Sequence, residues 1–281
     1  MINFEEGKRI AFLSDIHGNA DALEASLKAV QTLNVQTLVI LGDILTYGCQ
    51  PDRTLDLVAS TLERDNVYLV SGNHEQFYLA EPFQYADYLE HLPNWIQESV
   101  RWTQNQITYQ DLYAGFPWIE ELWIESCRCY VAHANPLGYG NWLYLNNDAK
   151  LMKAAEALCN KGAKIGIFGH THANRISILC SEGIRDIEDR HRITIPIDAT
   201  EMEIVIANTG AIGQPRGPDR RASFITLSRE KGHAVLECHK VDYDVESHVK
   251  AIINSSLSPA TKNRLVGFFG ISTNNTPESS P

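Results

Sequence analysis

Five short apolar runs in this chain each end at polar residues of the kinds that bind metal ions. The runs cover residues 10–13, 38–41, 67–70, 130–132 and 165–168. Short apolar runs of this kind indicate buried strands whose carboxyl ends carry function. The polar residues that follow supply two carboxylates, one amide and four imidazoles, and they predict a pocket for two hard or borderline divalent ions. These residues are Asp15, His17, Asp43, Asn73, His133, His170 and His172.

Strands and helices alternate through the first third of the chain, which indicates a parallel sheet covered by helices. Apolar residues at helical spacing predict helices over residues 21–33 and 51–63. From residue 175 to 236 the pattern is mostly strand, and residues 244–253 predict a closing helix. Residues 77–117 interrupt the alternation with many aromatic residues. We predict a small helical insertion there, which either packs on the sheet or caps the pocket.

Composition favours one large domain over residues 1–253, followed by a C-terminal extension, 254–281, that is partly disordered. The 281 residues are 44% hydrophobic and 21% charged, as in ordinary globular proteins. We find no signal peptide or membrane span, and the six cysteines are typical of reduced thiols, so we expect a cytoplasmic protein. The net charge of −11 argues against bulk nucleic-acid binding, but not against a small phosphorylated substrate. Assembly into a homo-oligomer stays open.

Residue spacing gives a first expectation of ligand geometry. In extended backbone, residues two apart share a face, so Asp15 and His17 are predicted to bind one ion together, and the histidines at 170 and 172 both to turn inward. Asp43 stands alone at a strand end and is the natural carboxylate to bridge two ions. Asn73 offers a neutral carbonyl oxygen, whereas its neighbour His74 points differently and is free to face a substrate.

Together these motifs resemble the pattern of the calcineurin-like metallophosphoesterase superfamily: Asp-x-His, Gly-Asp, Gly-Asn-His-Asp/Glu, His and Gly-His-x-His. Residues 42–48, 208–216 and 221–223 more specifically resemble a bacterial and archaeal branch of predicted phosphodiesterases. The resemblance covers about residues 8–241. Thr209 and Ala211 stand where that branch usually has proline and serine.

The resemblance implies an α/β (α+β) fold, a four-layer αββα sandwich, with two metal ions. The implied ligands are Asp15, His17 and His172 for one ion, Asn73, His133 and His170 for the other, and Asp43 for both. His74 matches the family's non-ligand histidine beside the leaving group and is the implied catalytic residue. Arg216 and Arg221 either clamp a substrate phosphate or fix their own loop.

The predicted function is metal-dependent hydrolysis of a small phosphodiester or phosphomonoester, by attack of metal-bound hydroxide on phosphorus. Four imidazole ligands favour Mn, Fe or Zn over Mg²⁺. The alternative is a non-catalytic metal-binding scaffold of the same fold, but such proteins tend to lose ligands or the leaving-group histidine, and this chain keeps them all. Substrate selectivity is expected from the insertion, where Tyr85 and Tyr88 are predicted to be exposed aromatic residues.

Overall fold

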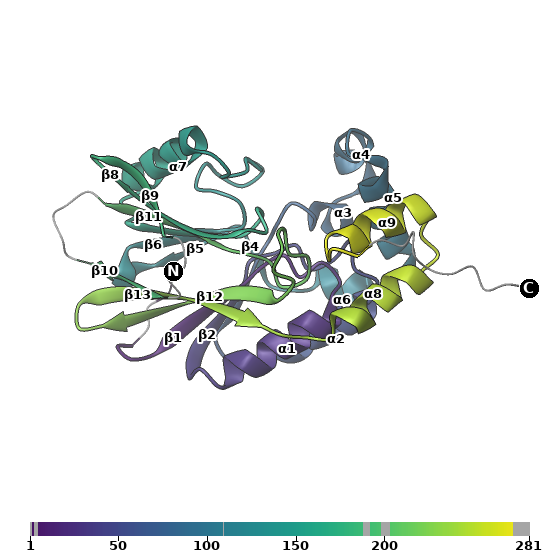
Figure 1. Cartoon of the computed structure of the whole chain (residues 1–281), viewed down its shortest axis with the longest axis horizontal. Helices are drawn as coiled ribbons and strands as arrows, with labels where there is room; N and C mark the ends of the chain where they lie inside the picture. The colour runs from purple at the N-terminus through teal and green to yellow at the C-terminus, as the bar shows by residue number, and fades with distance from the viewer. Residues whose placement is uncertain (1, 3–4, 109, 188–191, 198–202, 272–281) are drawn as a thin grey trace, which may run out of the picture.

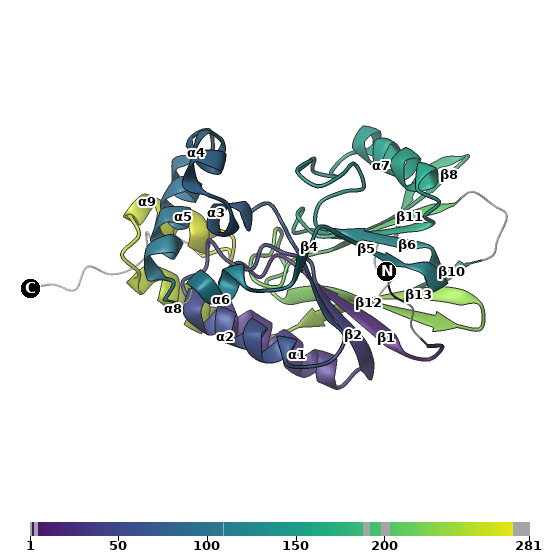
Figure 2. The same ribbon diagram turned by 180° about the vertical axis from the view of Figure 1, so that it is seen from behind.

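The computed structural model describes residues 2, 5–108, 110–187, 192–197 and 203–271, and it places two β-sheets face to face (Figures 1 and 2). Within those residues, the first sheet has seven strands, in the order β10 (Arg192–Pro196), β13 (His233–Val241), β12 (Ala222–Glu230), β1 (Arg9–Leu13), β2 (Val35–Ile40), β3 (Val67–Val70) and β4 (Trp118–Ile119). The second has six, in the order β5 (Glu121–Ile124), β6 (Cys129–Ala132), β7 (Ile165–Phe168), β11 (Ile204–Thr209), β8 (Asn174–Cys180) and β9 (Gly183–Asp186).

Helices cover the outer face of each sheet, which completes a four-layer αββα sandwich. The first sheet is covered by α1 (Ala20–Gln31) and α2 (Pro51–Leu62), and the second by α7 (Asp148–Asn160). The other helices gather mainly at one end of the sandwich: α3 (Gln76–Leu79), α4 (Pro82–Glu90), α5 (Asn94–Gln106), α6 (Gln110–Ala114), α8 (Val245–Asn254) and α9 (Pro259–Gly267). A short 3₁₀ helix, η1 (Glu125–Cys127), joins β5 to β6. No helix in the described part of the chain is long and apolar enough to cross a membrane.

Strand β1 shows why the strand sequences are continuous apolar runs. Ile10 and Phe12 lie in the core between the two sheets, whereas Ala11 and Leu13 pack against the outer helices. Successive side chains of a strand point to opposite faces, and both faces are buried over residues 10–13, so this part of β1 has no polar position. The parallel pairs β1–β2, β2–β3 and β6–β7 also bring their carboxyl ends to common edges.

Most elements match the sequence pattern, with one clear difference near the C-terminus. The helices predicted over 21–33 and 51–63 are α1 and α2, and 77–117 contains α4, α5, α6 and all of α3 except its first residue. The helix predicted over 244–253 is α8, but it does not close the fold, because α9 follows it. Ser258 caps α9 by accepting a hydrogen bond from the N–H of Thr261. Residues 272–281 of the predicted extension lie outside the described residues, and the domain limits stay a prediction.

Candidate metal centre

The predicted ligands lie at the carboxyl ends of β1, β2, β3, β6 and β7, where the two sheets meet. Hydrogen bonds join the loops of one sheet to those of the other. The backbone N–H of His170 donates to Oδ2 of Asp15 at 3.0 Å. Nδ1 of His133 contacts the carbonyl of Leu41. The ends of strands from both sheets therefore form a single cluster.

The first half of this cluster contains Asp15, His17 and His172. Oδ1 of Asp15 lies 3.3 Å from Nε2 of His172 and 3.9 Å from Nε2 of His17. The two Nε2 atoms are 3.2 Å apart. These three side chains are close enough to coordinate one ion, as the resemblance implies.

The second half contains Asp43, Asn73, His133 and His170. Nε2 of His133 lies 3.2 Å from Oδ1 of Asn73 and 3.4 Å from Oδ2 of Asp43. The rings of His133 and His170 have centroids 5.3 Å apart. Oδ2 of Asp43 is also 3.7 Å from Nε2 of His17 in the first half. One carboxylate oxygen thus lies near histidines of both groups, as the prediction of a bridging ligand requires.

Each imidazole ring is fixed by a hydrogen bond to a backbone carbonyl. The pairs are Nδ1 of His17 with Leu45 (3.1 Å), Nδ1 of His172 with Gln214 (2.7 Å), Nδ1 of His133 with Leu41, and Nε2 of His170 with Trp142 (3.0 Å). A carbonyl oxygen only accepts, so each of these nitrogens carries a proton and the other ring nitrogen faces the cluster. His170 would accordingly bind a metal through Nδ1, and the other three through Nε2.

The donor set fits two divalent ions. All the predicted ligands are buried, and Oδ1 of Asp15 has no hydrogen-bond partner among the described residues. A buried carboxylate oxygen without a partner is costly, and a bound cation would satisfy it. Carboxylate, amide and imidazole donors are those that Mn, Fe and Zn accept in proteins. The residues present therefore suit the group that the motifs imply.

Burial and the charge of Asp43 together set the protonation of the four histidines that are predicted ligands. Desolvation lowers the pKa of His17 and His172 well below its usual 6.5, and that of His170 to about 3. These rings are neutral, which is the form that binds metals. For His133, desolvation opposes the charge, but the neighbouring Asp43 carboxylate prevails and raises the pKa to about 10. Asp43 is thus the anionic centre of the cluster.

Five of the seven predicted ligands have left-handed backbone, including both residues of each Asp-x-His and His-x-His pair, so the expectation of extended spacing is wrong. The φ angles are 55° at Asp15, 45° at His17, 52° at Asp43, 63° at His170 and 58° at His172. Strands β1 and β7 end two residues before Asp15 and His170, and the ligands lie in the turns that follow. Each pair converges through a turn and not through the pleat of a strand. Left-handed backbone at non-glycine residues is strained and occurs mainly where function requires it.

Two motif glycines allow the loops to approach this closely. A Cβ atom at Gly42 would lie 2.4 Å from the backbone N of Gly72, and one at Gly169 would lie 1.8 Å from Oγ of Ser14. No side chain fits at such distances. The Gly-Asp and Gly-His motifs therefore need glycine because another loop occupies the space of the side chain.

His74 lies at the edge of the cluster and is held on both sides of its ring. Its backbone N–H donates to Oδ1 of Asp43 at 2.8 Å. Nδ1 lies 3.1 Å from Oγ1 of Thr46, and Nε2 lies 3.2 Å from the hydroxyl of Tyr47. Nε2 is 4.0 Å from Oδ2 of Asp43. Desolvation lowers the pKa of His74, although Asp43 acts in the opposite direction.

Sequence reasoning assigned no role to Tyr47 or Glu75, both of which shape the site. Glu75 is fully buried, and its carboxylate accepts the backbone N–H groups of Asp43 and Gly72 at 2.7 and 2.6 Å. The sequence did contain a signal for Glu75, because it is a charged residue in a motif that directly follows a buried strand. A charge in such a place is expected to be buried and must then have hydrogen-bond partners. The role of Tyr47 depends on its contact with His74, which local sequence does not reveal.

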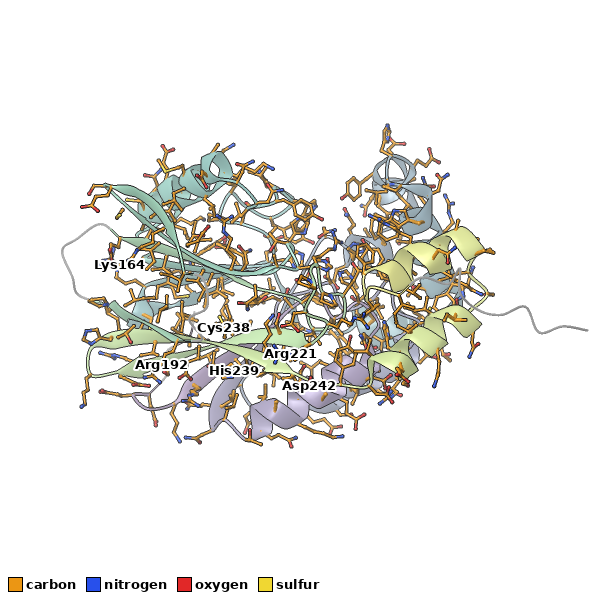
Figure 3. All side chains as sticks on the ribbon, in the orientation of Figure 1. Lys164, Arg192, Arg221, Cys238, His239 and Asp242 are labelled. Atoms are coloured by element: carbon orange, nitrogen blue, oxygen red, sulfur yellow. The ribbon has the colours of Figure 1, made fainter. Side chains whose placement is uncertain are left out.

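The two arginines suggested as phosphate ligands lie in different environments. Burial is the main cause of the low pKa of His74 and His172, and the Arg216 guanidinium lowers both further, so its charge acts on the cluster. Arg221, which directly precedes β12 (Figure 3), is exposed, and it donates to Asp219 with both Nε and Nη2, each at 3.0 Å. Both arginines are exposed, and Arg216 is the one of the two whose charge lowers the pKa of histidines in the cluster.

The insertion presents one exposed tyrosine at the predicted positions and not two. Tyr88 is 39% exposed and stacks on Phe77, with ring centroids 5.9 Å apart. Tyr85 is only 8% exposed, and its hydroxyl accepts a hydrogen bond from Gln104 at 2.9 Å. The prediction that Tyr85 is exposed is wrong, because the helix α4 turns this residue toward α5 and the core.

Comparisons with known proteins agree with this geometry. The family model for calcineurin-like phosphoesterases matches residues 8–174. The uncharacterized protein MJ0912 of Methanocaldococcus jannaschii is 28% identical over 250 residues, which cover 88% of this chain and 93% of that protein. A metallophosphoesterase from Sphaerobacter thermophilus superposes with a TM-score of 0.68 at 22% identity, over 92% of this chain and 99% of that chain.

A second solved structure, the hypothetical protein PH1004 from Pyrococcus horikoshii OT3, gives a TM-score of 0.69 at 15% identity, over 92% of this chain and 97% of that chain. At such identities the two structures show that the fold is shared. The matched family model spans more than half of the 281 residues. The resemblance inferred from the motifs is confirmed, and the chain belongs to the calcineurin-like phosphoesterase family.

Proposed function

We propose that this protein hydrolyses small phosphodiesters or phosphomonoesters at a centre of two divalent metal ions. The observation that carries the proposal is the position of Asp43, whose Oδ2 lies 3.7 Å from Nε2 of His17 and 3.4 Å from Nε2 of His133. A shared carboxylate between two histidine-containing groups is the arrangement that dinuclear phosphoester chemistry needs. The net charge of −11 further favours a small substrate over bulk nucleic acid.

The ligand assignment follows the two halves of the cluster. One ion would be held by Asp15, His17 and His172 and the other by Asn73, His133 and His170, with Asp43 between them. When bound, the ions supply Lewis acidity and a nucleophile at neutral pH. We propose Mn, Fe or Zn because four of the ligands are imidazoles.

The chain itself binds and orients the phosphoryl group. Arg216 forms no ion pair among the described residues, and its Nη2 donates to Oε1 of Gln214 at 3.2 Å. The guanidinium also lies over the ring of Phe268, 4.9 Å from the centroid. A positioned guanidinium without a carboxylate partner is suited to phosphoryl oxygens, which it can bind with two parallel N–H groups.

His74 is the proposed group beside the leaving oxygen. Thr46 lies between His74 and Tyr78, whose hydroxyl is 2.6 Å from Oγ1 of Thr46. If Tyr78 donates to Thr46 and Thr46 donates to Nδ1 of His74, the ring proton is at Nε2. Nε2 then points to the cluster, where its N–H can donate a hydrogen bond to the leaving oxygen and stabilise the charge that develops there.

Metal analysis and one variant test this proposal. We expect about two ions per chain after reconstitution with excess Mn²⁺, because each half of the cluster provides a complete set of donors. His74→Ala should keep both ions and lose turnover by roughly 10²- to 10⁴-fold, the range for a positioned acid–base group. His91→Ala is the control, since His91 is an exposed histidine at the end of α4. At most one bound ion, or full turnover of an alkyl phosphoester by His74→Ala, would contradict the proposal.

The compartment is also a proposal. The six cysteines in the sequence all lie in the described residues, and all are free thiols. Unpaired thiols, two of them buried, are typical of a reducing environment. On this observation we propose the cytoplasm.

A further inference from the structure

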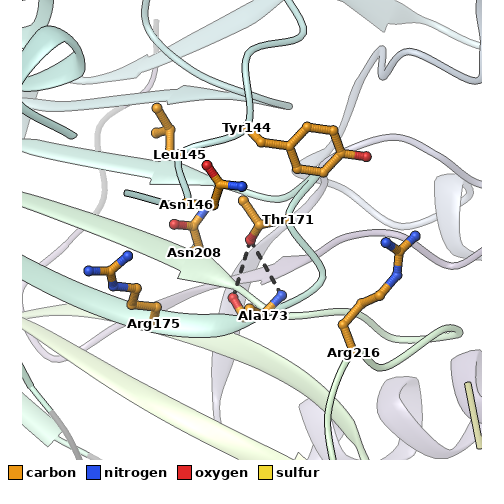
Figure 4. A pocket seen from close by; sticks show the side chains of 8 residues that line it. All are labelled: Tyr144, Leu145, Asn146, Thr171, Ala173, Arg175, Asn208 and Arg216. Carbon is orange, nitrogen blue, oxygen red and sulfur yellow. Dashed lines mark hydrogen bonds between the residues drawn. The ribbon is translucent and has the colours of Figure 1, made fainter. Parts of the chain in front are cut away.

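A cleft opens beside the metal centre, and Figure 4 shows the side chains that line it. It has a volume of about 480 Å³, within the range of small-molecule sites. Its walls include Tyr144, Asn146, Thr171, Arg175 and Arg216, and we refer to it as the Tyr144 cleft. The seven ligands and His74 do not line it, so the chemistry described above leaves its purpose open.

The Tyr144 cleft lies next to the cluster. Thr171, on its floor, stands between the ligands His170 and His172 in the chain. The ring of Tyr144 lies against the ring of His170, with centroids 4.0 Å apart and planes inclined by 31°. Arg216 lines the same cleft and carries the charge that acts on the cluster. A group attached to a phosphate at the metal centre can therefore extend into the cleft.

Tyr144 is an aromatic surface that is fixed in place and still accessible. Its side chain is 40% exposed, although the ring is held by His170 on one side. The N–H of Asn146 donates to the carbonyl of Tyr144 at 3.0 Å, which fixes the loop. Among the described residues, no hydrogen bond involves the Tyr144 hydroxyl. A rigid, exposed ring without polar partners is suited to stacking with a planar group.

Charge differs between the two ends of the cleft. At the end toward the cluster, Arg216 has no carboxylate partner in the described chain. At the other end, Arg175 donates to both carboxylate oxygens of Asp186, at 2.9 and 2.7 Å, and lies 4.0 Å from Asp148. The far end therefore offers no excess positive charge. A ligand that matches this pattern has its anionic group near Arg216 and an uncharged group toward Arg175.

We propose that the Tyr144 cleft binds the organic group of the substrate and selects phosphoesters that carry a planar, uncharged ring, stacked on Tyr144. A nucleobase and an aryl group share this chemistry. The inference rests on the proposed function, since it assumes that the phosphate is held at the metal centre beside Arg216. It adds the substrate class that the metal ligands by themselves do not select.

Binding of phosphonates tests the cleft without any turnover. Phenylphosphonate and methylphosphonate present the same anion, and neither contains a phosphoester bond. With Mn²⁺-loaded protein we expect phenylphosphonate to bind about 5- to 100-fold more tightly, as stacking of one ring on an aromatic side chain provides. Tyr144→Leu should bring this ratio close to one, and Tyr144→Phe should keep it. Tyr139→Leu is the matched control, because Tyr139 is 46% exposed in the same loop and does not line the cleft.

Turnover provides the second measurement. Adenosine 5′-phosphate methyl ester and ribose 5-phosphate methyl ester differ only in the base, and chromatography follows both. We expect the base to raise kcat/KM in the wild type and not in Tyr144→Leu. Metal content is measured in each variant, because a displaced His170 would lower it. The inference would be overturned if the wild type bound the two phosphonates equally well, or if Tyr144→Leu kept the wild-type ratio of phosphonate affinities. Absence of all turnover together with selective phosphonate binding would instead contradict the proposed function and leave the cleft assignment supported.

Discussion

Replacing Glu75 by glutamine tests how strongly the metal centre depends on one buried carboxylate. Oε2 of Glu75 accepts the backbone N–H groups of Gly72 at 2.6 Å and Asp43 at 2.7 Å. Oε1 accepts the N–H of Ile44 at 3.0 Å and the hydroxyl of Tyr113 at 2.6 Å. One side chain thus joins the loop after β2, which holds the bridging ligand, to the loop after β3, which holds Asn73.

The cost of the change follows from these four contacts. Glutamine has the same shape, but one of its two terminal positions is a donor. The least costly orientation puts the NH₂ group where Oε1 was, because the Tyr113 hydroxyl can turn and accept from it. The N–H of Ile44 then loses its acceptor, which costs about 1–3 kcal/mol for a buried group. The hydrogen bonds from the N–H groups of Gly72 and Asp43 remain, but they become weaker because their acceptor is no longer charged. We therefore expect the free energy of unfolding to fall by about 2–4 kcal/mol.

Urea denaturation at neutral pH measures this loss, and a titration with Mn²⁺ measures the effect on the metal centre. We expect Glu75→Gln to weaken Mn²⁺ binding as well, because the loop that carries Asp43 is no longer anchored. The matched control is Glu90→Gln, an exposed position on α4, which should stay within about 0.5 kcal/mol of the wild type. If Glu75→Gln is as stable as that control and binds metal normally, the anchoring role of Glu75 is wrong.

Three further changes address the bridge, the arginine and the fold. Asp43→Asn should lower metal content below two ions per chain in elemental analysis, because the shared oxygen loses its charge; unchanged content would argue against bridging. Phe268→Leu should raise KM several-fold at constant metal content, since Arg216 loses the ring beneath it. A change in kcat alone would contradict the role of Phe268 in positioning Arg216. Desolvation lowers the pKa of His248 to about 4, so the folded state binds fewer protons and stability falls as pH drops from about 6.5 to 4, by at most about 3 kcal/mol. Unfolding measured against pH should show a shallower fall in His248→Phe.

The strands and the predicted ligands could be identified from sequence because their signals are local. A strand buried on both faces is a continuous apolar run, as in 10–13, and a ligand must follow it directly to reach the shared edge. The chemical character of Asp, Asn and His side chains then limits what such a cluster can bind. None of this depends on residues distant in the chain.

What could not be predicted depends on contacts between distant segments. Tyr144 acquires its place by stacking on His170, and Arg216 by lying over Phe268 of the C-terminal helices. Tyr144 belongs to no local pattern that indicates a partner, and the motif at 208–216, which includes Arg216, does not reveal that Phe268 lies beneath the guanidinium. The buried Tyr85 shows the same limit, since whether an aromatic residue of a helix is exposed depends on which face the rest of the fold covers.

Left-handed backbone extends beyond the ligands, and its distribution identifies which other residues the site needs. Thr46 and Tyr47 have φ angles of 74° and 69°, although neither is a predicted ligand. Glycine would adopt this conformation without the steric penalty that a side chain incurs. The strain is therefore explained only if the two side chains are required, and both contact the ring of His74, one at each nitrogen. Tyr47 also packs on Trp95, with centroids 5.3 Å apart, so the helical end of the molecule supports this contact. The strained turn after β2 thus serves two purposes, since it presents Asp43 to the metal ions and fixes His74 beside them.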